Sequence, residues 1–195
     1  MSRGLGDVYK RQCLDTQDTE EIIQAVKNIA PGFGGINLED ISAPRCFEIE
    51  ERLKEMLDIP VFHDDQHGTA IVVLAGIING LRVTGKKKED CRVVVNGAGS
   101  AGVAITKLLL TYGFKHVTMC DREGIIGKDY PNLNWMQKKM TEVTNLENAS
   151  GTLADALRGA DIFVGVSAPN IVTPEMVSSM NKDAILFAMA NPVPE

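Results

Sequence analysis

The sequence lacks the features that would place it among secreted, disulfide-rich or membrane proteins. Its four cysteines are widely separated and form no C-x-x-C pair, which argues against a disulfide framework and a zinc ribbon. The longest apolar run, residues 69–81, is shorter than the roughly 20 residues that cross a bilayer, and we expect a buried helix there. Residues 1–12 contain no apolar stretch typical of a secretory signal. We therefore expect reduced thiols, a cytoplasmic location and no membrane partner.

An excess of basic charge is also absent. The net charge of −6 at pH 7 argues against nucleic acid as a partner, because the negatively charged protein and the negatively charged phosphates would repel each other. A small anionic substrate would then need local cations or a metal ion. With 195 residues, of which 44% are hydrophobic and 24% charged, the chain can bury at least one core.

Residues 19–83 alternate short apolar stretches with helical patterns. Asp18 precedes acidic residues and an apolar repeat at helical spacing, which indicates a helix start. Two short extended stretches each end in acids: Glu39 and Asp40 after the first, Asp64 and Asp65 after the second. The pattern predicts helices over 19–29, from Pro44 onward and over 69–83, with strands over 34–38 and 60–62.

From Arg92 the pattern becomes one of apolar strands alternating with helices. This alternation is typical of a parallel sheet with crossover helices, so we predict an α/β fold with a Rossmann-like doubly wound parallel sheet. Residues 124–150 are polar and predict a loop with one helix around 135–143. The predicted strands cover 92–95, 116–120, 162–166 and 185–189, and the predicted helices cover 101–112 and 152–158.

A glycine-rich turn, Gly97-x-Gly99-x-x-Gly102, lies between a valine strand and a helix, the context typical of a dinucleotide site. The first glycine permits the turn, the second lets a pyrophosphate approach, and the third lets helix and strand pack closely. Asp121 ends the next strand about 20 residues on, where a carboxylate would bind ribose hydroxyls and favour NAD. Arg122 and Lys128 could instead pair with the 2′-phosphate of NADP.

The acids at the strand ends suggest a second site. Glu39, Asp40 and Asp65 could supply the oxygen ligands that Mg²⁺ or Mn²⁺ prefers. Exposed acids in such places are also often solvated or cap helices. His63 and His67 offer a zinc alternative if both are helical, although the extended stretch before them argues against a helix.

Five strings in the sequence resemble one family, the small bacterial malic enzymes: FGGINLEDISAP, PVFHDDQHGTA, NGAGSAG, CDREG and AMANPVPE. The resemblance runs from about Cys13 to Glu195. It implies that Glu39, Asp40 and Asp65 are the metal ligands and that Asp64 supports the catalytic groups. It places Asn191 near the nicotinamide and the substrate. The cofactor residues that it implies are Gly97, Ala98, Gly99, Ser100, Ala101, Gly102, Asp121 and Asn191.

The resemblance implies oxidative decarboxylation of malate to pyruvate and CO₂, with reduction of NAD or NADP and a requirement for Mg²⁺ or Mn²⁺, by a homo-oligomeric enzyme. Malolactic chemistry, which retains the cofactor, stays open. So does a non-catalytic nucleotide-binding module. An amino-acid or folate dehydrogenase would have a similar cofactor domain but no use for the paired acids.

The resemblance also implies a fragment. The family's catalytic tyrosine and lysine belong upstream of the Glu39-Asp40 motif, and the chain stops directly after N-P-x-P-E. We therefore expect this chain alone to be inactive. We expect a non-native or disordered leader over 1–12, the C-terminal part of a metal and substrate domain over 13–84, and a truncated NAD(P)-binding domain over 85–195.

Overall fold

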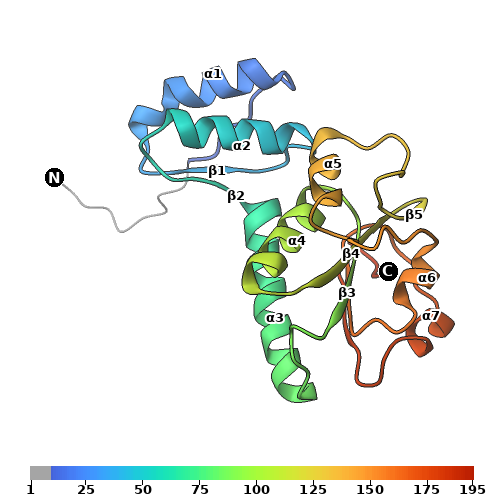
Figure 1. Ribbon diagram of the computed structural model, residues 1–195. Helices are drawn as coiled ribbons and strands as arrows, with labels where there is room; N and C mark the ends of the chain where they lie inside the picture. The colour runs from blue at the N-terminus through green and yellow to red at the C-terminus, as the bar shows by residue number, and fades with distance from the viewer. Residues whose placement is uncertain (1–9) are drawn as a thin grey trace.

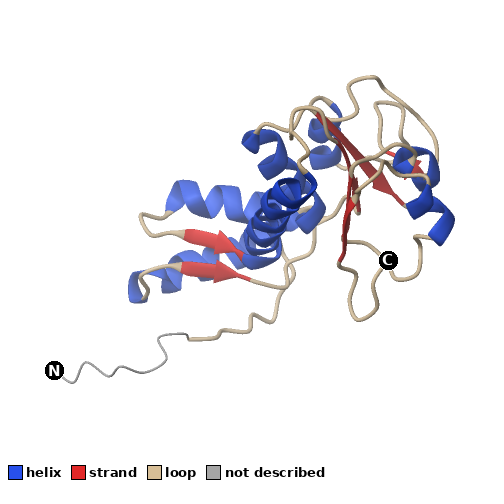
Figure 2. Ribbon diagram, turned by 90° about the horizontal axis from the view of Figure 1, so that it is seen from below, coloured by secondary structure: helices blue, strands red, loops and turns tan. Residues whose placement is uncertain are grey.

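Two sheets of unequal size organise residues 10–195, the part of the chain that the computed structural model describes. The first has two strands and belongs to residues 19–63, called the small unit here. The second has five strands and, with its helices, forms the larger body of the chain (Figure 1). In the view from below, helices lie between the strands of the small sheet and those of the large sheet (Figure 2). Of the leader expected over 1–12, residues 1–9 lie outside the described part.

The small unit forms as the sequence predicts. Helix α1, Thr19–Ile29, begins after Asp18, whose side chain accepts hydrogen bonds from the backbone N–H groups of Glu20 and Glu21. It is followed by a short 3-10 turn, Ala30–Gly32, and by strand β1, Ile36–Leu38. Helix α2 spans Arg45–Met56 and strand β2 spans Val61–His63. Apolar side chains of both helices and both strands form one core cluster: Ile22, Ile23, Val26, Leu38, Ile49, Leu53 and Val61.

The expectation that no helix forms between His63 and His67 is wrong for most of that segment. Residues Asp64–Gly68 form a π-helical turn, closed by a hydrogen bond from the N–H of Thr69 to the carbonyl of Asp64. Pro60 does not prevent this, because it precedes β2 and restricts only the backbone beside it. The turn runs directly into helix α3, Thr69–Thr84.

The continuous helix Asp64–Thr84 has 21 residues and contains an 18-residue stretch with a mean hydropathy of 1.3, so by length and composition alone it could cross a membrane. A core helix meets the same criteria. Ala70, Val73 and Ile77 are buried against the large sheet, whereas Ile71 and Val72 on the opposite side are exposed. The expectation of a buried helix is therefore correct for one face only.

The larger sheet has the strand order β5-β4-β3-β6-β7. The four long strands pair in parallel, as predicted. The short edge strand β5 pairs antiparallel to β4 and was missed, because its two residues are too few to show a pattern. The strands are β3, Arg92–Asn96, β4, His116–Asp121, β5, Gly124–Ile125, β6, Ile162–Gly165, and β7, Ile185–Ala188.

Alternate residues of the strands face two helical layers. Val93 and Val95 of β3 pack toward α3 and α4, Ser100–Tyr112, whereas Val94 packs toward α6, Leu153–Leu157. Helix α7, Pro174–Ser178, which the sequence analysis did not predict, covers the latter side. Helix α5, Trp135–Thr141, packs with α2 of the small unit in a third cluster. The α/β fold with a mostly parallel, Rossmann-like sheet is confirmed.

Asp161 links three segments at the amino end of the large sheet. One carboxylate oxygen accepts hydrogen bonds from Lys86 Nζ at 2.8 Å and Asn181 Nδ2 at 3.1 Å. The other accepts from the backbone N–H of Arg92 at 2.9 Å. Because Asp161 and Lys86 are both largely buried, this acid fixes the start of β3 to residues that follow α3 and α7.

Candidate cofactor cleft and acidic edge

The glycine turn connects β3 to α4, and each glycine has its own geometric reason. Gly97 has φ 110°, and an added Cβ would lie 2.6 Å from the carbonyl oxygen of Val166. A Cβ on Gly102 would lie 1.7 Å from the carbonyl oxygen of Gly97. Gly99 has nothing within 4 Å of such a Cβ, so that position opens to solvent. The turn therefore needs the outer two glycines for folding and leaves the middle one free for a ligand.

Helix α4 begins at this turn without a side-chain cap. Its N-cap residue is Gly99, and within residues 10–195 no side-chain hydrogen bond caps the helix. The first turn of a helix leaves its N–H groups without intrahelical partners, and these carry the positive end of the helix dipole. The N–H groups of Ser100 and Ala101 are thus available to an anion such as a pyrophosphate.

The other predicted cofactor residues share the carboxyl edge of the same sheet. Gly97 directly follows β3, Asp121 ends β4, and Asn191 comes shortly after β7. Strand order reverses between β3 and β6, and ligands of open parallel sheets bind at such a switch point. One oxygen of Asp121 accepts from the N–H of Arg122 at 2.9 Å, which leaves the other for a ribose hydroxyl. The sheet topology therefore gathers residues that are far apart in the sequence.

Three residues of this edge were not identified from the sequence: Val166, Ser167 and Glu195. The carbonyl of Val166 presses against Gly97, and Ser167 accepts a hydrogen bond from Asn96 Nδ2 at 2.7 Å. Glu195 bonds to backbone groups beside β6 and β7. The only signal in the sequence for Val166 and Ser167 was their position shortly after a strand, which many residues share, and Glu195 lies seven residues after β7.

The predicted metal ligands lie at one edge of the small sheet. Strands β1 and β2 pair in parallel with Leu38 opposite His63, so Glu39 and Asp64 leave the sheet at the same end. Glu39 accepts from Asn37 Nδ2 at 2.9 Å, and Asp40 adopts a left-handed backbone with φ 57°. Among residues 10–195, however, no three metal-ligating side chains converge on one point. The fold brings the backbones of the acids together but not their carboxylates.

His63 and His67 have different environments, which does not support the zinc alternative. His63 is fully buried, and burial lowers its pKa. Neither of its ring nitrogens has a hydrogen-bond partner in the described part of the chain, although Nδ1 lies 4.0 Å from a carboxylate oxygen of Asp65. His67 instead pairs through Nε2 with Glu50. Buried polar groups without a protein partner often bond to ordered water or to an ion. The ring of His63 therefore leaves a place for such a water or ion at the acidic edge.

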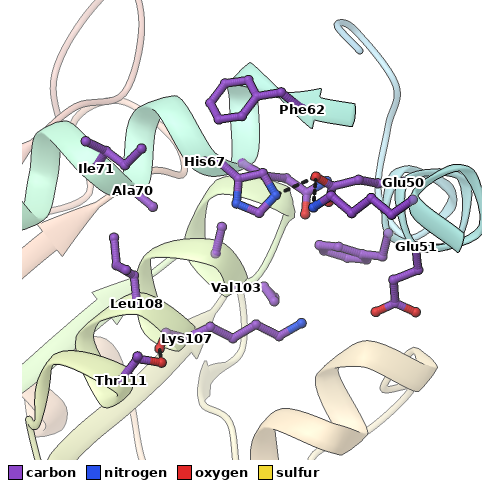
Figure 3. A pocket seen from close by; sticks show the side chains of 14 residues that line it. Glu50, Glu51, Phe62, His67, Ala70, Ile71, Val103, Lys107, Leu108 and Thr111 are labelled. Carbon is purple, nitrogen blue, oxygen red and sulfur yellow. Dashed lines mark hydrogen bonds and ion pairs between the residues drawn. The ribbon is translucent and has the colours of Figure 1, made fainter. Parts of the chain in front are cut away.

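A cavity of about 580 Å³ lies elsewhere, between α2, the π-helical turn, α3 and α4. Figure 3 shows Glu50 and His67 facing each other there, with Lys107 extending from α4 below them. Glu50 is buried and also accepts from Lys54 Nζ at 2.8 Å. None of the predicted cofactor or metal residues lines this cavity. It is distinct from the carboxyl edge of the large sheet, where the predicted cofactor residues lie.

Comparison with known proteins agrees with the strings quoted above. Residues 66–195 match the family "Malic enzyme, NAD binding domain", and residues 5–54 match "Malic enzyme, N-terminal domain". The chain is 60% identical to the NAD-dependent malic enzyme of Geobacillus stearothermophilus, over 94% of this chain and 38% of that protein. It is 52% identical to the bifunctional malic/malolactic enzyme of Bacillus subtilis, over 93% of this chain and 45% of that protein.

A solved structure is similar as well. The NAD-dependent malic enzyme of Thermotoga maritima superposes with a TM-score of 0.91 at 51% identity, over 94% of this chain and 49% of that one. This chain thus spans less than half the length of these relatives. Because the NAD-binding family match covers most of the residues and includes the glycine turn, the chain belongs to the malic enzyme family.

Proposed function

We propose that this chain forms the dinucleotide-binding part and the metal-binding edge of an enzyme that oxidises malate to pyruvate and CO₂ while reducing NAD⁺ or NADP⁺. The observation that carries the proposal is the uncapped N-terminus of α4, which lies behind a glycine turn at the switch point of the sheet. Such a site binds a pyrophosphate. Family membership supports malate as the substrate. The relatives named for this activity are more than twice as long as this chain.

The predicted cofactor residues at the carboxyl edge of the large sheet have separate roles in the proposal. The N–H groups of Ser100 and Ala101 would bind the pyrophosphate, and Asp121 would bind the adenosine ribose. Asn191 would contact the nicotinamide and the substrate from the end of β7. Together these positions would present the nicotinamide ring to malate at the carboxyl edge.

We propose Glu39, Asp40 and Asp65 as ligands of Mg²⁺ or Mn²⁺, with Asp64 in support. An all-oxygen donor set fits these hard cations, and β1 and β2 hold the four residues at one end of the small sheet. Asp65 is about half exposed and free to turn toward an ion. The cation would polarise the C2 oxygen of malate and stabilise negative charge that develops there.

Calorimetric titration with malate tests the metal proposal. In the presence of NADH, Mn²⁺ should strengthen malate binding by at least about tenfold, because the cation would chelate the substrate. Asp65→Asn should abolish this dependence. Asp58→Asn, a change of an exposed acid in the small unit, should preserve it. Binding that is equal with and without Mn²⁺ would instead favour a non-catalytic nucleotide-binding module.

Asp121 should set the preference between the two nicotinamide cofactors. Its carboxylate would repel the 2′-phosphate of NADP, whereas the neighbouring Arg122 could attract it. In Asp121→Asn the ratio of the NADPH and NADH dissociation constants should shift by about tenfold toward NADPH, equivalent to about 1.4 kcal/mol. Fluorescence titration with NADPH and NADH measures this ratio. An unchanged ratio would show that Asp121 turns away from the ribose.

The Bacillus subtilis relative is named for malolactic as well as malic activity. Product analysis of the full-length enzyme distinguishes lactate from pyruvate.

The free state of Cys13, Cys46, Cys91 and Cys120 supports the proposed cytoplasmic location. The exposed apolar side chains of Ile71 and Val72 on α3 support a homo-oligomer.

A further inference from the structure

The side chain of Glu195 joins the ends of two neighbouring strands. Its Oε1 accepts a hydrogen bond from the backbone N–H of Ser167, which comes shortly after β6, at 2.9 Å. Its Oε2 accepts from the backbone N–H of Ala190, after β7, also at 2.9 Å. One carboxylate thus holds both segments at the carboxyl edge of the sheet, and the end of the chain lies beside that sheet (Figure 1).

Neighbouring residues of the sheet edge lie close to this carboxylate. A Cβ on Gly165, the last residue of β6, would lie 2.4 Å from Cδ of Glu195, so a larger residue there would displace the carboxylate. Ser167 is held from the opposite side by Asn96, the last residue of β3. The contact therefore extends across β3, β6 and β7, three adjacent strands at the switch point.

Both segments border the proposed cofactor site. Val166, next to Ser167, presses its carbonyl against Gly97 of the glycine turn. Asn191, next to Ala190, is the residue proposed to meet the nicotinamide. The proposed pyrophosphate and ribose contacts, by contrast, come from α4 and β4, and the hydrogen bonds of Glu195 go to Ser167 and Ala190 instead. Glu195 is therefore tied directly to the segment that carries Asn191, and to the glycine turn only through the neighbour of Ser167.

We propose that Glu195 is a positioning residue for the nicotinamide half of the cofactor. It acts through Ser167 and Ala190, whose backbones it fixes, and it touches no reacting atom. The inference rests on the proposed dinucleotide function. A glutamine at this position would have the same shape but only one acceptor oxygen, so one of the two backbone N–H groups would lose its partner.

The test compares a ligand that contains nicotinamide with one that does not. NADH and ADP-ribose are titrated into this chain and into Glu195→Gln, with NADH followed by its own fluorescence. NADH affinity should fall by about tenfold, since a lost bond to a charged acceptor is of that size. ADP-ribose affinity should stay within about twofold, because Ser100, Ala101 and Asp121, the residues proposed to bind that ligand, form no hydrogen bond with Glu195. The fluorescence enhancement of bound NADH should also fall.

Two further variants test whether the loss of NADH affinity comes from the Glu195 carboxylate. Gly165→Ala should give the same selective loss, because its methyl group would displace the Glu195 carboxylate by another route. Glu147→Gln, an exposed change in a remote loop, should alter neither affinity. Thermal melting of each variant checks that it is folded.

The outcomes are separable. An equal loss for NADH and ADP-ribose, or no loss for either, would overturn the role of Glu195. Failure of the unaltered chain to bind both ligands would overturn the dinucleotide function itself.

Discussion

Gly102→Ala should abolish detectable dinucleotide binding and destabilise the fold by about 3 kcal/mol, at the upper end of the range for overpacking. The reason is that its Cβ would lie 1.7 Å from the carbonyl oxygen of Gly97, a backbone atom that cannot move without opening the turn. Opening the turn would move the N-terminus of α4 away from the strand that positions it. Urea unfolding measures the stability loss, and calorimetry with NADH measures the binding loss.

Gly99→Ala is the matched control. An added methyl group there meets nothing within 4 Å, and the backbone φ of −86° suits alanine. Stability should stay within about 0.5 kcal/mol of the unaltered chain, as for other surface changes. NADH binding should still weaken, because the methyl group would occupy the space through which the pyrophosphate approaches. Equal stability of the two variants would show that the third glycine does not serve packing.

Asp161→Asn should produce the largest loss of stability among single changes that leave the cofactor edge untouched. Removing one partner of a buried ion pair costs about 3 to 5 kcal/mol, because the other charge remains without its counterion. Lys86 would be left in that state, with its side chain largely buried. The exposed neighbour Asp90→Asn provides the control, with an expected change below about 0.5 kcal/mol. Urea unfolding at pH 7 gives both values.

The same change has a predicted pH dependence. Burial alone would raise the pKa of Asp161, but the hydrogen bonds from Lys86, Arg92 and Asn181 outweigh it and hold the pKa below its ordinary value. A lowered pKa in the folded state contributes stability above the unfolded value of about 3.9, and this contribution disappears as pH falls through the folded pKa. The stability difference between Asp161→Asn and the unaltered chain should therefore shrink below about pH 4. A constant difference down to pH 3 would contradict this account.

Local sequence patterns predicted most of the fold, because most strands and helices contain apolar runs or capping residues that mark them within their own residues. The strand Arg92–Asn96 is a nearly continuous apolar run, and α1 has an N-cap at Asp18. Elements without such signals were missed: β5 has two residues and α7 has five. The π-helical turn at Asp64–Gly68 was also missed, since its i→i+5 bond leaves no distinctive residue pattern.

The candidate site could be predicted where one residue type answers one geometric need. Only glycine suits the backbone of Gly97 and the contact at Gly102. Glu195 could not be identified this way, because its role depends on backbone N–H groups of Ser167 and Ala190 that any residue could supply. The acidic edge lies between these cases. The pairing of β1 with β2 gathers Glu39 and Asp65 in space, but side-chain directions follow from packing and ligands rather than from sequence order.

The small sheet has only two strands of three residues each, and a sheet of that size is marginally stable unless helices cover it. Its persistence rests on the core shared by α1 and α2. Local unfolding of this unit should therefore require less free energy than unfolding of the five-stranded sheet. Glu39 and Asp40 at its edge would then lie on the part of the chain that opens first, whereas Asp64 and Asp65 lie in the turn that continues into α3. A cation bound only to the closed form would raise the free energy of that opening by mass action, so metal concentration would determine how often the acidic edge is lost.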